Sequence, residues 1–233
     1  MPIEIVAIIP ARGGSKGLSR KNLRVVGGMS LVAHAIRAGL ESARVDATYV
    51  STEDDEIAAA TLQHGASLIR RPAELATDIA QNDSVLRHAL HTIRHDGHDP
   101  KILVLLQPTS PFRRASHVDG ALELFVNGAA ASVISICDVD HHPGKAVRLD
   151  GGLIEPFTND RDMEARRQDM TPVYRQNGAI YVTHVADFLE SNQLFRRPCK
   201  GYRMTRRESI DIDDEFDLQF AEFIAGPPPE PSR

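Results

Sequence analysis

The chain has 233 residues, which suits one domain of ordinary size. Its 27 Lys and Arg residues and 32 Asp and Glu residues give a net charge of −5, which argues against a general nucleic-acid-binding protein. No apolar run reaches the roughly 18 residues of a membrane span, and residues 1–10 lack the regions of a signal peptide. We therefore expect a cytoplasmic protein without a membrane partner, in which Cys137 and Cys199 are reduced thiols.

The first part of the chain alternates apolar, strand-length segments with segments of helical periodicity. Strands are expected at residues 3–9, 47–51, 102–106 and 132–137. Helices are expected between them, at residues 31–43, 54–64, 84–94 and 118–127. Nearly continuous apolar strands separated by helices predict an α/β fold with a mostly parallel sheet that is covered on both faces.

The pattern changes after residue 138. Residues 141–169 are polar and rich in turn-forming residues, with a hairpin expected at Asp150–Gly152. A polar segment of this length is uncommon in a compact domain unless it is functional, so it predicts an arm that covers the site or reaches a partner subunit. The later elements are expected at 178–183, 185–191 and 214–224. We expect one domain over residues 1–225, with an insertion at 139–183, and a disordered proline-rich tail at 226–233.

The loop after the first strand is the most informative segment. It combines three glycines with four cationic side chains, namely Gly13, Gly14 and Gly17 with Arg12, Lys16, Arg20 and Lys21. Glycine lets backbone N–H groups approach phosphate oxygens, while the cations offset their charge. The spacing matches neither of the two common nucleotide-binding fingerprints, so a basic surface turn is the alternative on composition alone.

Two further segments carry polar side chains that suit ligand binding. Gln107 ends an apolar strand, where its donor and acceptor suit a sugar hydroxyl or a base edge, with a loop-capping amide as the alternative. Asp211 and Asp213 alternate, so on a strand both carboxylates would share one face and would repel unless a cation or donors lay between them. Mg²⁺ (or Mn²⁺) suits such a pair together with substrate phosphates, and a polar edge strand is the alternative.

Five segments resemble, in chain order, the family of CMP-N-acetylneuraminate (CMP-sialic acid) synthetases, the cytidylyltransferases that activate nonulosonic acids. They are P-A-R-G-G-S-K-G with R-K-N, R-P-A-E-L-A-T-D, L-L-Q-P-T-S-P-F-R, R-Q-N-G-A-I-Y and S-I-D-I-D. The match spans residues 3–224. The resemblance implies a Rossmann-like nucleotide-diphospho-sugar transferase fold with an inserted dimerisation arm, and a homodimer.

The resemblance also assigns the site. The nucleotide would be bound by Ala11, Arg12, Gly13, Gly14, Ser15, Lys16, Lys21, Asn22, Arg71 and Ser84. The acidic nine-carbon sugar would be bound by Gln107, Lys145, Arg167, Arg175, Asn177, Tyr181 and Phe195. The metal ligands would be Asp211 and Asp213, and the catalytic residues Arg12, Lys21 and Asp211.

The implied reaction is attack of the sugar's anomeric 2-hydroxyl on the α-phosphorus of CTP, with release of pyrophosphate. N-acetylneuraminate is the first expected acceptor. The alternatives are legionaminic acid, Kdn or another ulosonate or phosphonate, and R-Q-N-G-A-I-Y favours the sialic and legionaminic branch over the pseudaminic one. A non-catalytic nucleotide-sugar-binding protein is the rival of another class. Lys21, Asp211 and Asp213 argue against it, because a sensor needs no metal at a reacting phosphate.

Overall fold

A computed structural model describes residues 3–15, 17–77 and 82–226, and the predicted tail lies outside them except for Gly226. The main sheet consists of β1 (Ile5–Pro10), β4 (Ala47–Thr52), β5 (Ser67–Arg70), β6 (Ile102–Leu106), β7 (Ser132–Asp138), β10 (Tyr174–His184) and β11 (Cys199–Arg203). The spatial order is β11-β7-β10-β6-β1-β4-β5. Only β10 is antiparallel to its neighbours, so the predicted mostly parallel α/β sheet is confirmed.

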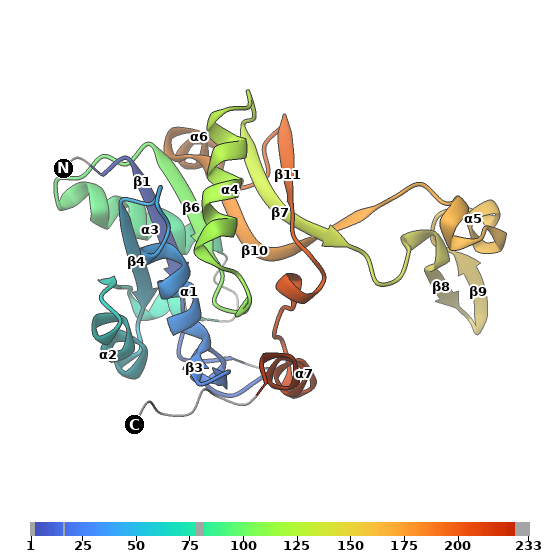
Figure 1. Ribbon diagram of the computed structural model, residues 1–233, viewed down its shortest axis with the longest axis horizontal. Coiled ribbons are helices and arrows are strands. Elements are labelled where there is room, and N and C mark those ends of the chain that lie inside the picture. The colour runs from blue at the N-terminus through green and yellow to red at the C-terminus, as the bar shows by residue number, and fades with distance from the viewer. Residues whose placement is uncertain (1–2, 16, 78–81, 227–233) are drawn as a thin grey trace.

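Helices cover both faces of this sheet (Figure 1). They are α1 (Leu31–Leu40), α2 (Asp55–Gln63), α3 (Asn82–His95), α4 (Ala115–Val126) and α6 (Val185–Ser191). Strand β1 shows why an almost wholly apolar strand belongs here. Val6 and Ile8 pack in the cluster with α3 and α6, whereas Ala7 and Ile9 pack in the cluster with α1, α2 and α4.

The closing helix α7 (Glu215–Ala225) packs on a third, smaller cluster that includes Leu18 and Ile212. A two-stranded ribbon of β2 (Val25–Val26) and β3 (Met29–Ser30) lies between the glycine-rich loop and α1. Among the described residues, no helix combines the length and apolar character needed to cross a membrane. Both cysteines are free.

The predicted elements are confirmed within four residues at either end, with the largest difference at the start of β10, and the strand at 102–106 and the helix at 185–191 are confirmed to the residue. Strands β5 and β11 were not expected. The strand considered for Asp211 and Asp213 is not formed. The structure has a 3₁₀ turn at Arg207–Ser209, and residues 210–214 follow as an extended segment outside the sheet. Its Ile212 N–H donates to the carbonyl of Thr109.

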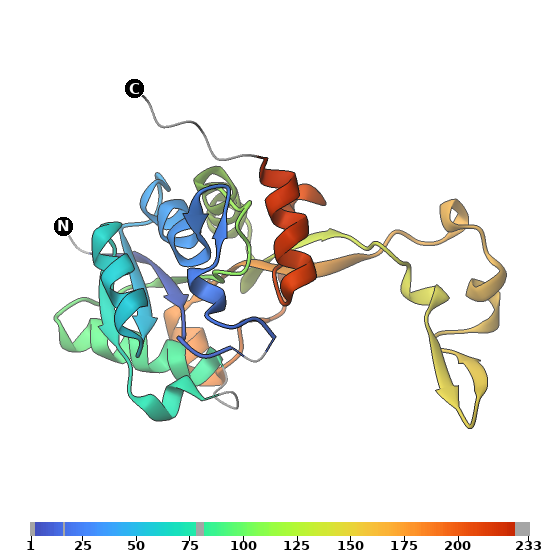
Figure 2. The same ribbon diagram turned by 90° about the horizontal axis from the view of Figure 1, so that it is seen from below.

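Residues 139–173 form an arm that projects from the ends of β7 and β10, away from the main body (Figures 1 and 2). It carries β8 (Val147–Asp150), β9 (Leu153–Pro156) and the short helix α5 (Asp160–Glu164). Gly151 and Gly152 have φ values of 53° and 88°, as a two-residue type I′ turn requires, so the predicted hairpin is confirmed. The insertion was expected to reach residue 183, but residues 174–184 are β10 of the main sheet.

The docking of α6 on the sheet generates a stability prediction. Phe188 is fully buried in the cluster beneath α6 and α3. We expect Phe188→Ala to lower the free energy of unfolding by about 3–5 kcal/mol, because it removes buried area and leaves a cavity. The matched control is Phe223→Ala on α7, where the side chain is 80% exposed and the change should stay within about 0.5 kcal/mol. Urea unfolding measures both, and equal free energies for the two variants would contradict the described packing.

Candidate active site

A cavity of about 300 Å³ lies at the carboxyl ends of the parallel strands, where ligands of open α/β sheets bind. The predicted site residues that line it are Arg12, Gly14, Ser15, Lys21, Asn22, Arg71, Gln107, Asp211 and Asp213. They come from the loops after β1, β5 and β6 and from the segment before α7. The structure therefore brings together most of the predicted nucleotide-binding residues, Gln107 and both predicted metal ligands.

Three members of the glycine-rich loop fix its path. The Ala11 N–H donates to the carbonyl of Ser51 at 3.0 Å, and the amide of Asn22 donates to the carbonyl of Arg12 at 2.8 Å. The Gly13 N–H donates to Glu53 at 2.7 Å, and a Cβ on Gly13 would lie 2.3 Å from the carboxylate of Asp54. These contacts leave the cavity side of the loop to Arg12, Gly14 and Ser15.

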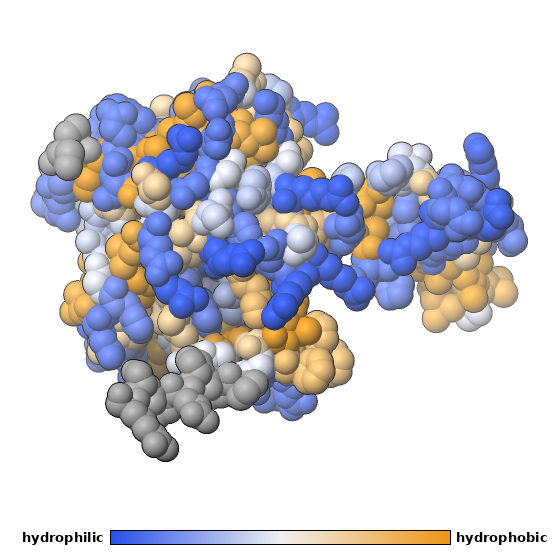
Figure 3. All heavy atoms as spheres, viewed as in Figure 1, coloured by the Kyte–Doolittle hydropathy of each residue, from blue (hydrophilic) through white to orange (hydrophobic). Residues whose placement is uncertain are grey.

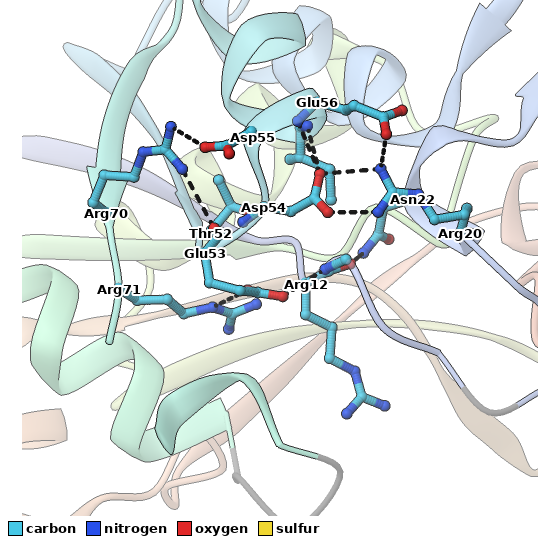
Figure 4. Close-up of polar contacts among 12 residues, drawn as sticks. Arg12, Arg20, Asn22, Thr52, Glu53, Asp54, Asp55, Glu56, Arg70 and Arg71 are labelled. Atoms are coloured by element: carbon cyan, nitrogen blue, oxygen red, sulfur yellow. Dashed lines mark hydrogen bonds and ion pairs between the residues drawn. The ribbon is translucent and has the colours of Figure 1, made fainter. Parts of the chain in front are cut away.

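Two consecutive carboxylates after β4 bind this loop, and Figure 4 shows them. Glu53 accepts the Gly13 N–H with one oxygen and the Nε–H of Arg71, at 3.0 Å, with the other. Asp54 accepts N–H groups of the first turn of α2 and pairs with Arg20 at 2.5 Å. Although burial alone would raise the pKa of Asp54, hydrogen bonds from Arg20 and from the helix lower it. Sequence reasoning missed Glu53; its position directly after a buried strand, in S-T-E-D-D, was the available signal.

Arg71 is the buried cation of the cavity. Its side chain is only 3% exposed, and its Nη2 has no hydrogen-bond partner within the described part of the chain. Burial lowers the pKa of Arg71, while the charge of Glu53 opposes that effect. In Figure 4 the side chain of Arg12 leaves the loop on the side of Arg71 and away from the Arg20–Asp54 pair. A buried donor without a partner on a cavity wall indicates an acceptor supplied by a ligand.

The acidic pair lies on the same cavity. Asp213 is exposed and binds Nζ of Lys21 at 3.0 Å. The half-buried Asp211 has a carboxylate oxygen, Oδ1, that is buried without a partner among residues 3–15, 17–77 and 82–226. Burial raises the pKa of Asp211, and the charge of Asp213 adds to this, whereas a hydrogen bond from Thr109 opposes it.

This donor set fits a divalent cation. A second positive charge beside Asp211 would offset the burial of its carboxylate, and two carboxylates with substrate phosphates and water suit Mg²⁺. The described residues contain no cluster of three or more His, Cys, Asp or Glu side chains arranged for a metal. The remaining ligands would therefore have to come from substrate and water.

Several predicted acceptor residues lie close to Asp211. Burial, together with the charge of Asp211, raises the pKa of Tyr181, and the charge of Arg175 acts on Asp211 in turn. Gly178, with φ of 75°, lets β10 pass so near that a Cβ there would lie 2.7 Å from Oε1 of Gln107. These residues form a polar corner around Asp211 and Gln107, although Tyr181 and Arg175 are not on the described wall of the main cavity.

Other predicted residues lie elsewhere. Lys145 and Arg167 are in the arm, where Lys145 donates to two backbone carbonyls at 2.6 and 2.7 Å and Arg167 donates to the carbonyl of Val139 at 3.1 Å. Phe195 lines a separate, more apolar hollow beside β11. Ser84 is in the first turn of α3 and is not on the described wall of the main cavity. Lys16 lies outside the described residues.

Asn177 requires a correction. The sequence predicts a sugar contact for it, but the side chain is only 1% exposed. Its amide oxygen accepts from Ser135 at 2.6 Å and its nitrogen donates to Ser209 at 2.8 Å. Both ends of the amide are used inside the protein, so Asn177 joins β7, β10 and the segment that leads to Asp211.

A doubly covered, mostly parallel sheet with a cationic glycine loop, a buried arginine and an acidic pair at its carboxyl edge places the protein among the α/β proteins that bind ligands at this edge of the sheet. Residues 6–224 match the family model described as cytidylyltransferase. The chain belongs to this family, and the resemblance found in its five sequence segments is confirmed.

The relatives include N-acylneuraminate cytidylyltransferases. The one from Streptococcus agalactiae serotype III (strain NEM316) is 34% identical over 91% of this chain and 51% of its own length. The one from Escherichia coli O18:K1:H7 (strain RS218 / NMEC) is 33% identical over 95% of this chain and 52% of its own length. The chain thus spans about half the length of these curated relatives. The CMP-N,N′-diacetyllegionaminic acid synthase of Legionella pneumophila is 33% identical over 94% of this chain and 95% of its own length.

Solved structures agree on the fold. A CMP:2-keto-3-deoxy-manno-octonic acid synthetase in complex with CTP superposes with a TM-score of 0.70 at 17% identity, over 95% of this chain and 98% of its own. The 4-diphosphocytidyl-2C-methyl-D-erythritol synthase of Anaerococcus prevotii gives a TM-score of 0.64 at 14% identity, over 95% and 97%. The predicted Rossmann-like nucleotidyltransferase architecture is confirmed.

The unpartnered oxygen of Asp211 generates a metal-binding prediction. We expect Mg²⁺ or Mn²⁺ with CTP to raise the melting temperature of the wild type more than CTP alone does, and to add little in Asp211→Asn. Because folding raises the pKa of Asp211, the ionised wild type loses stability as pH rises above the ordinary Asp range, so metal-free Asp211→Asn should melt higher at neutral pH.

Thermal shift at fixed pH, with and without chelator, measures both effects. The control is Asp96→Asn, an exposed carboxylate just after α3, which should keep the full metal-dependent shift. An equal metal-dependent shift in Asp211→Asn and in the wild type would overturn the assignment.

Proposed function

We propose that this protein transfers CMP from CTP to the anomeric 2-hydroxyl of an acidic nine-carbon sugar, N-acetylneuraminate first, with release of pyrophosphate. The observation that carries this proposal is the composition of one cavity, which combines a guanidinium nitrogen of Arg71 and a carboxylate oxygen of Asp211 that both lack a partner among the described residues. A ligand that satisfies both needs an anionic group and an associated cation, as a nucleoside triphosphate with its metal does. The names of the relatives, which are N-acylneuraminate cytidylyltransferases, point the same way.

The step is an in-line displacement. The sugar oxygen forms a bond to the α-phosphorus, the bond from that phosphorus to the bridging oxygen breaks, and pyrophosphate leaves with the bonding electrons while the hydroxyl proton passes to solvent. Negative charge grows on the departing phosphate oxygens. Arg12 and Lys21 line the cavity and are the residues we assign to stabilising that charge. Arg71, fixed by Glu53, would bind an oxygen of the nucleotide.

Asp211 and Asp213 would hold Mg²⁺ or Mn²⁺, which supplies charge neutralisation at the phosphates and acidifies the attacking hydroxyl. Lys21 pairs with Asp213 at 3.0 Å and lines the same cavity, so its ammonium lies beside the proposed metal ligand and would face the substrate phosphates. The acceptor would lie toward the corner formed by Gln107, Tyr181 and Arg175, where a guanidinium suits the sugar carboxylate.

A specific observation favours a second acceptor. The legionaminic acid synthase of Legionella pneumophila is a relative that this chain matches over nearly the whole length of both proteins. Legionaminic acid derivatives are therefore the second candidate, with the same CTP chemistry. A non-catalytic nucleotide-sugar-binding role would not explain the carboxylate oxygen of Asp211 that is buried without a partner among the described residues.

A pyrophosphate-release assay with CTP, Mg²⁺ and a panel of acidic sugars tests the proposal. We expect turnover with N-acetylneuraminate or a legionaminic acid, and much slower turnover when UTP or ATP replaces CTP. No pyrophosphate release with any acidic sugar would overturn the proposed activity. Comparable turnover with UTP would overturn the nucleotide assignment.

Removing one charge stabiliser should act on the chemical step. We expect Lys21→Ala and Arg12→Ala each to lower kcat by about 10²-fold or more, the effect of losing one preorganised charge stabiliser. The KM for CTP should rise less, because the backbone of the loop and Arg71 still bind the nucleotide. The control is Lys101→Ala, whose ammonium is 60% exposed and pairs with Asp99. A large rise in KM with unchanged kcat would make these residues ground-state binders only.

The arm supports the proposal of a homodimer. Its hairpin exposes Leu149, Leu153 and Ile154 to the extent of 75%, 71% and 65%, and Figure 3 shows this hydrophobic patch over β8 and β9. A two-stranded hairpin is marginally stable alone in water, so an apolar hairpin on a projecting arm needs a surface to cover it. We propose that a second copy of the chain supplies this surface. The arm then carries Lys145 and Arg167 to an acceptor site shared by two subunits.

Subunit mixing tests the shared site. We expect Arg12→Ala and Arg167→Ala homodimers each to be weakly active, and a mixture of the two to regain part of the activity, because each mixed dimer has one site with both arginines. Pyrophosphate release after unfolding and refolding together measures this, with separately refolded proteins as the control. Full activity of a species that sediments as a monomer would contradict the dimer.

A further inference from the structure

Arg113 is a buried cation behind the cavity wall. Its side chain belongs to the S-P-F-R end of the third sequence segment, L-L-Q-P-T-S-P-F-R, and is 2% exposed. Its Nη1 donates to the backbone carbonyl of Gln107 at 2.8 Å and to that of Ala179 at 2.9 Å. Its Nε and Nη2 are buried and have no hydrogen-bond partner among the described residues.

No carboxylate neutralises this charge within the part of the chain that the structure describes. Arg71, the other buried arginine, has Glu53, but Arg113 contacts only two neutral carbonyls. The charge of Arg113 also reaches His34 and His117, where burial is the main cause of a lowered pKa. The guanidinium itself is still protonated at neutral pH, although burial lowers the pKa of Arg113 to about 9.

An unpaired buried charge is unfavourable, and two carbonyls do not require a guanidinium. A neutral amide donor could satisfy a carbonyl without the cost of burying a charge. The missing anion must then be sought outside the described part of the chain, and the position of Arg113 points to the cavity. Gln107 lines the cavity with its side chain while its carbonyl binds Arg113. Ala179 follows Gly178, which lies against the side chain of Gln107 and close to Asp211.

We propose that Arg113 is a positioning residue whose uncompensated charge, buried behind Gln107, favours binding of the polyphosphate and is in turn neutralised by it. The inference rests on the proposed function for the identity of the ligand. The interaction crosses a poorly hydrated wall, where a charge acts over a longer range than in water. The resulting stabilisation must increase with the number of phosphate groups, which a merely structural role for Arg113 does not require.

The test compares Arg113→Gln with the wild type in binding CTP, CDP, CMP and cytidine, which differ only in phosphate number. Dissociation constants are measured by calorimetry, or by ligand-observed NMR where binding is weak, in the presence of chelator. We expect Arg113→Gln to weaken CTP binding by about tenfold or more, CMP binding less, and cytidine binding not at all. The glutamine still donates a hydrogen bond to a carbonyl, so the fold is expected to persist.

Arg113→Met, which removes the charge and both hydrogen bonds, provides a second measurement. We expect its free energy of unfolding to stay close to that of the wild type, since the loss of the hydrogen bonds to two carbonyls is offset by the removal of an unpaired buried charge. The matched control is Arg94→Gln on α3, which changes net charge equally but at an exposed site paired with Asp99. Arg94→Gln should leave the dissociation constants of CTP, CDP, CMP and cytidine unchanged.

The outcomes separate the two proposals. An equal loss of affinity for all four ligands, cytidine included, would overturn the electrostatic role of Arg113 and leave the proposed reaction in place. A graded loss in a protein that releases no pyrophosphate with any acidic sugar would support the role of Arg113 and overturn the reaction. Strong destabilisation by Arg113→Met, with an ungraded series in Arg113→Gln, would make Arg113 a structural residue.

Discussion

The site depends on the carboxylate of Glu53, whose two oxygens accept hydrogen bonds from two different parts of the chain. Glu53 accepts the N–H of Gly13 and the Nε–H of Arg71, so the path of the glycine-rich loop and the position of the buried guanidinium are set by the same group. Removing that carboxylate would leave a nearly fully buried cation without its anion and a loop without one of its anchors, and buried charges that lose a partner are strongly unfavourable. Glu53 is therefore a structural precondition for a nucleotide site that it does not line.

The carboxylates around the cavity fall into two groups. Glu53 and Asp54 are used by the loop, by Arg71, by Arg20 and by the first turn of α2, and they define the shape of the site. Asp211 retains a buried oxygen without a partner, as Arg71 and Arg113 retain nitrogens. Buried polar groups without partners are rare in folded proteins, and here both signs occur around one cavity. That combination is what a polyanion accompanied by a cation would satisfy, and neither component alone would do so.

The sequence predicted those elements whose residue types are by themselves typical of the structure that they form. β1 and β6 are apolar throughout because both faces of the sheet are covered, and the two glycines of the arm require a turn of positive φ. β11, with the sequence C-K-G-Y-R, lies at a sheet edge and has no apolar run to detect. The alternation of Asp211 with Asp213 correctly placed both carboxylates on one cavity, but the segment is extended without being a strand, since Ile212 packs beneath α7.

The structural role of Asn177 could not be predicted from its neighbours in sequence. Its partners Ser135 and Ser209 are 42 and 32 residues away in sequence, and only the fold brings their hydroxyls to the amide. The same limit applies to Glu53, whose meaning depends on Arg71 arriving from the next strand. Residue type predicted which groups take part in chemistry, but the number of hydrogen bonds already used inside the protein decides which of them remain available to a ligand.

The two halves of the site are built differently, and this difference bears on the assembly. The proposed nucleotide half lies within one chain, because the residues that line the cavity follow parallel strands that end at one edge of the sheet. The acceptor candidates are divided between β10, a separate hollow at Phe195 and an arm that leaves the body altogether. Lys145 and Arg167 donate to backbone carbonyls of the arm, so within a single chain these two side chains stabilise the arm itself. If the acceptor is the proposed acidic sugar, its carboxylate needs cations at the edge of the nucleotide half, and the arm of the proposed second subunit would supply them.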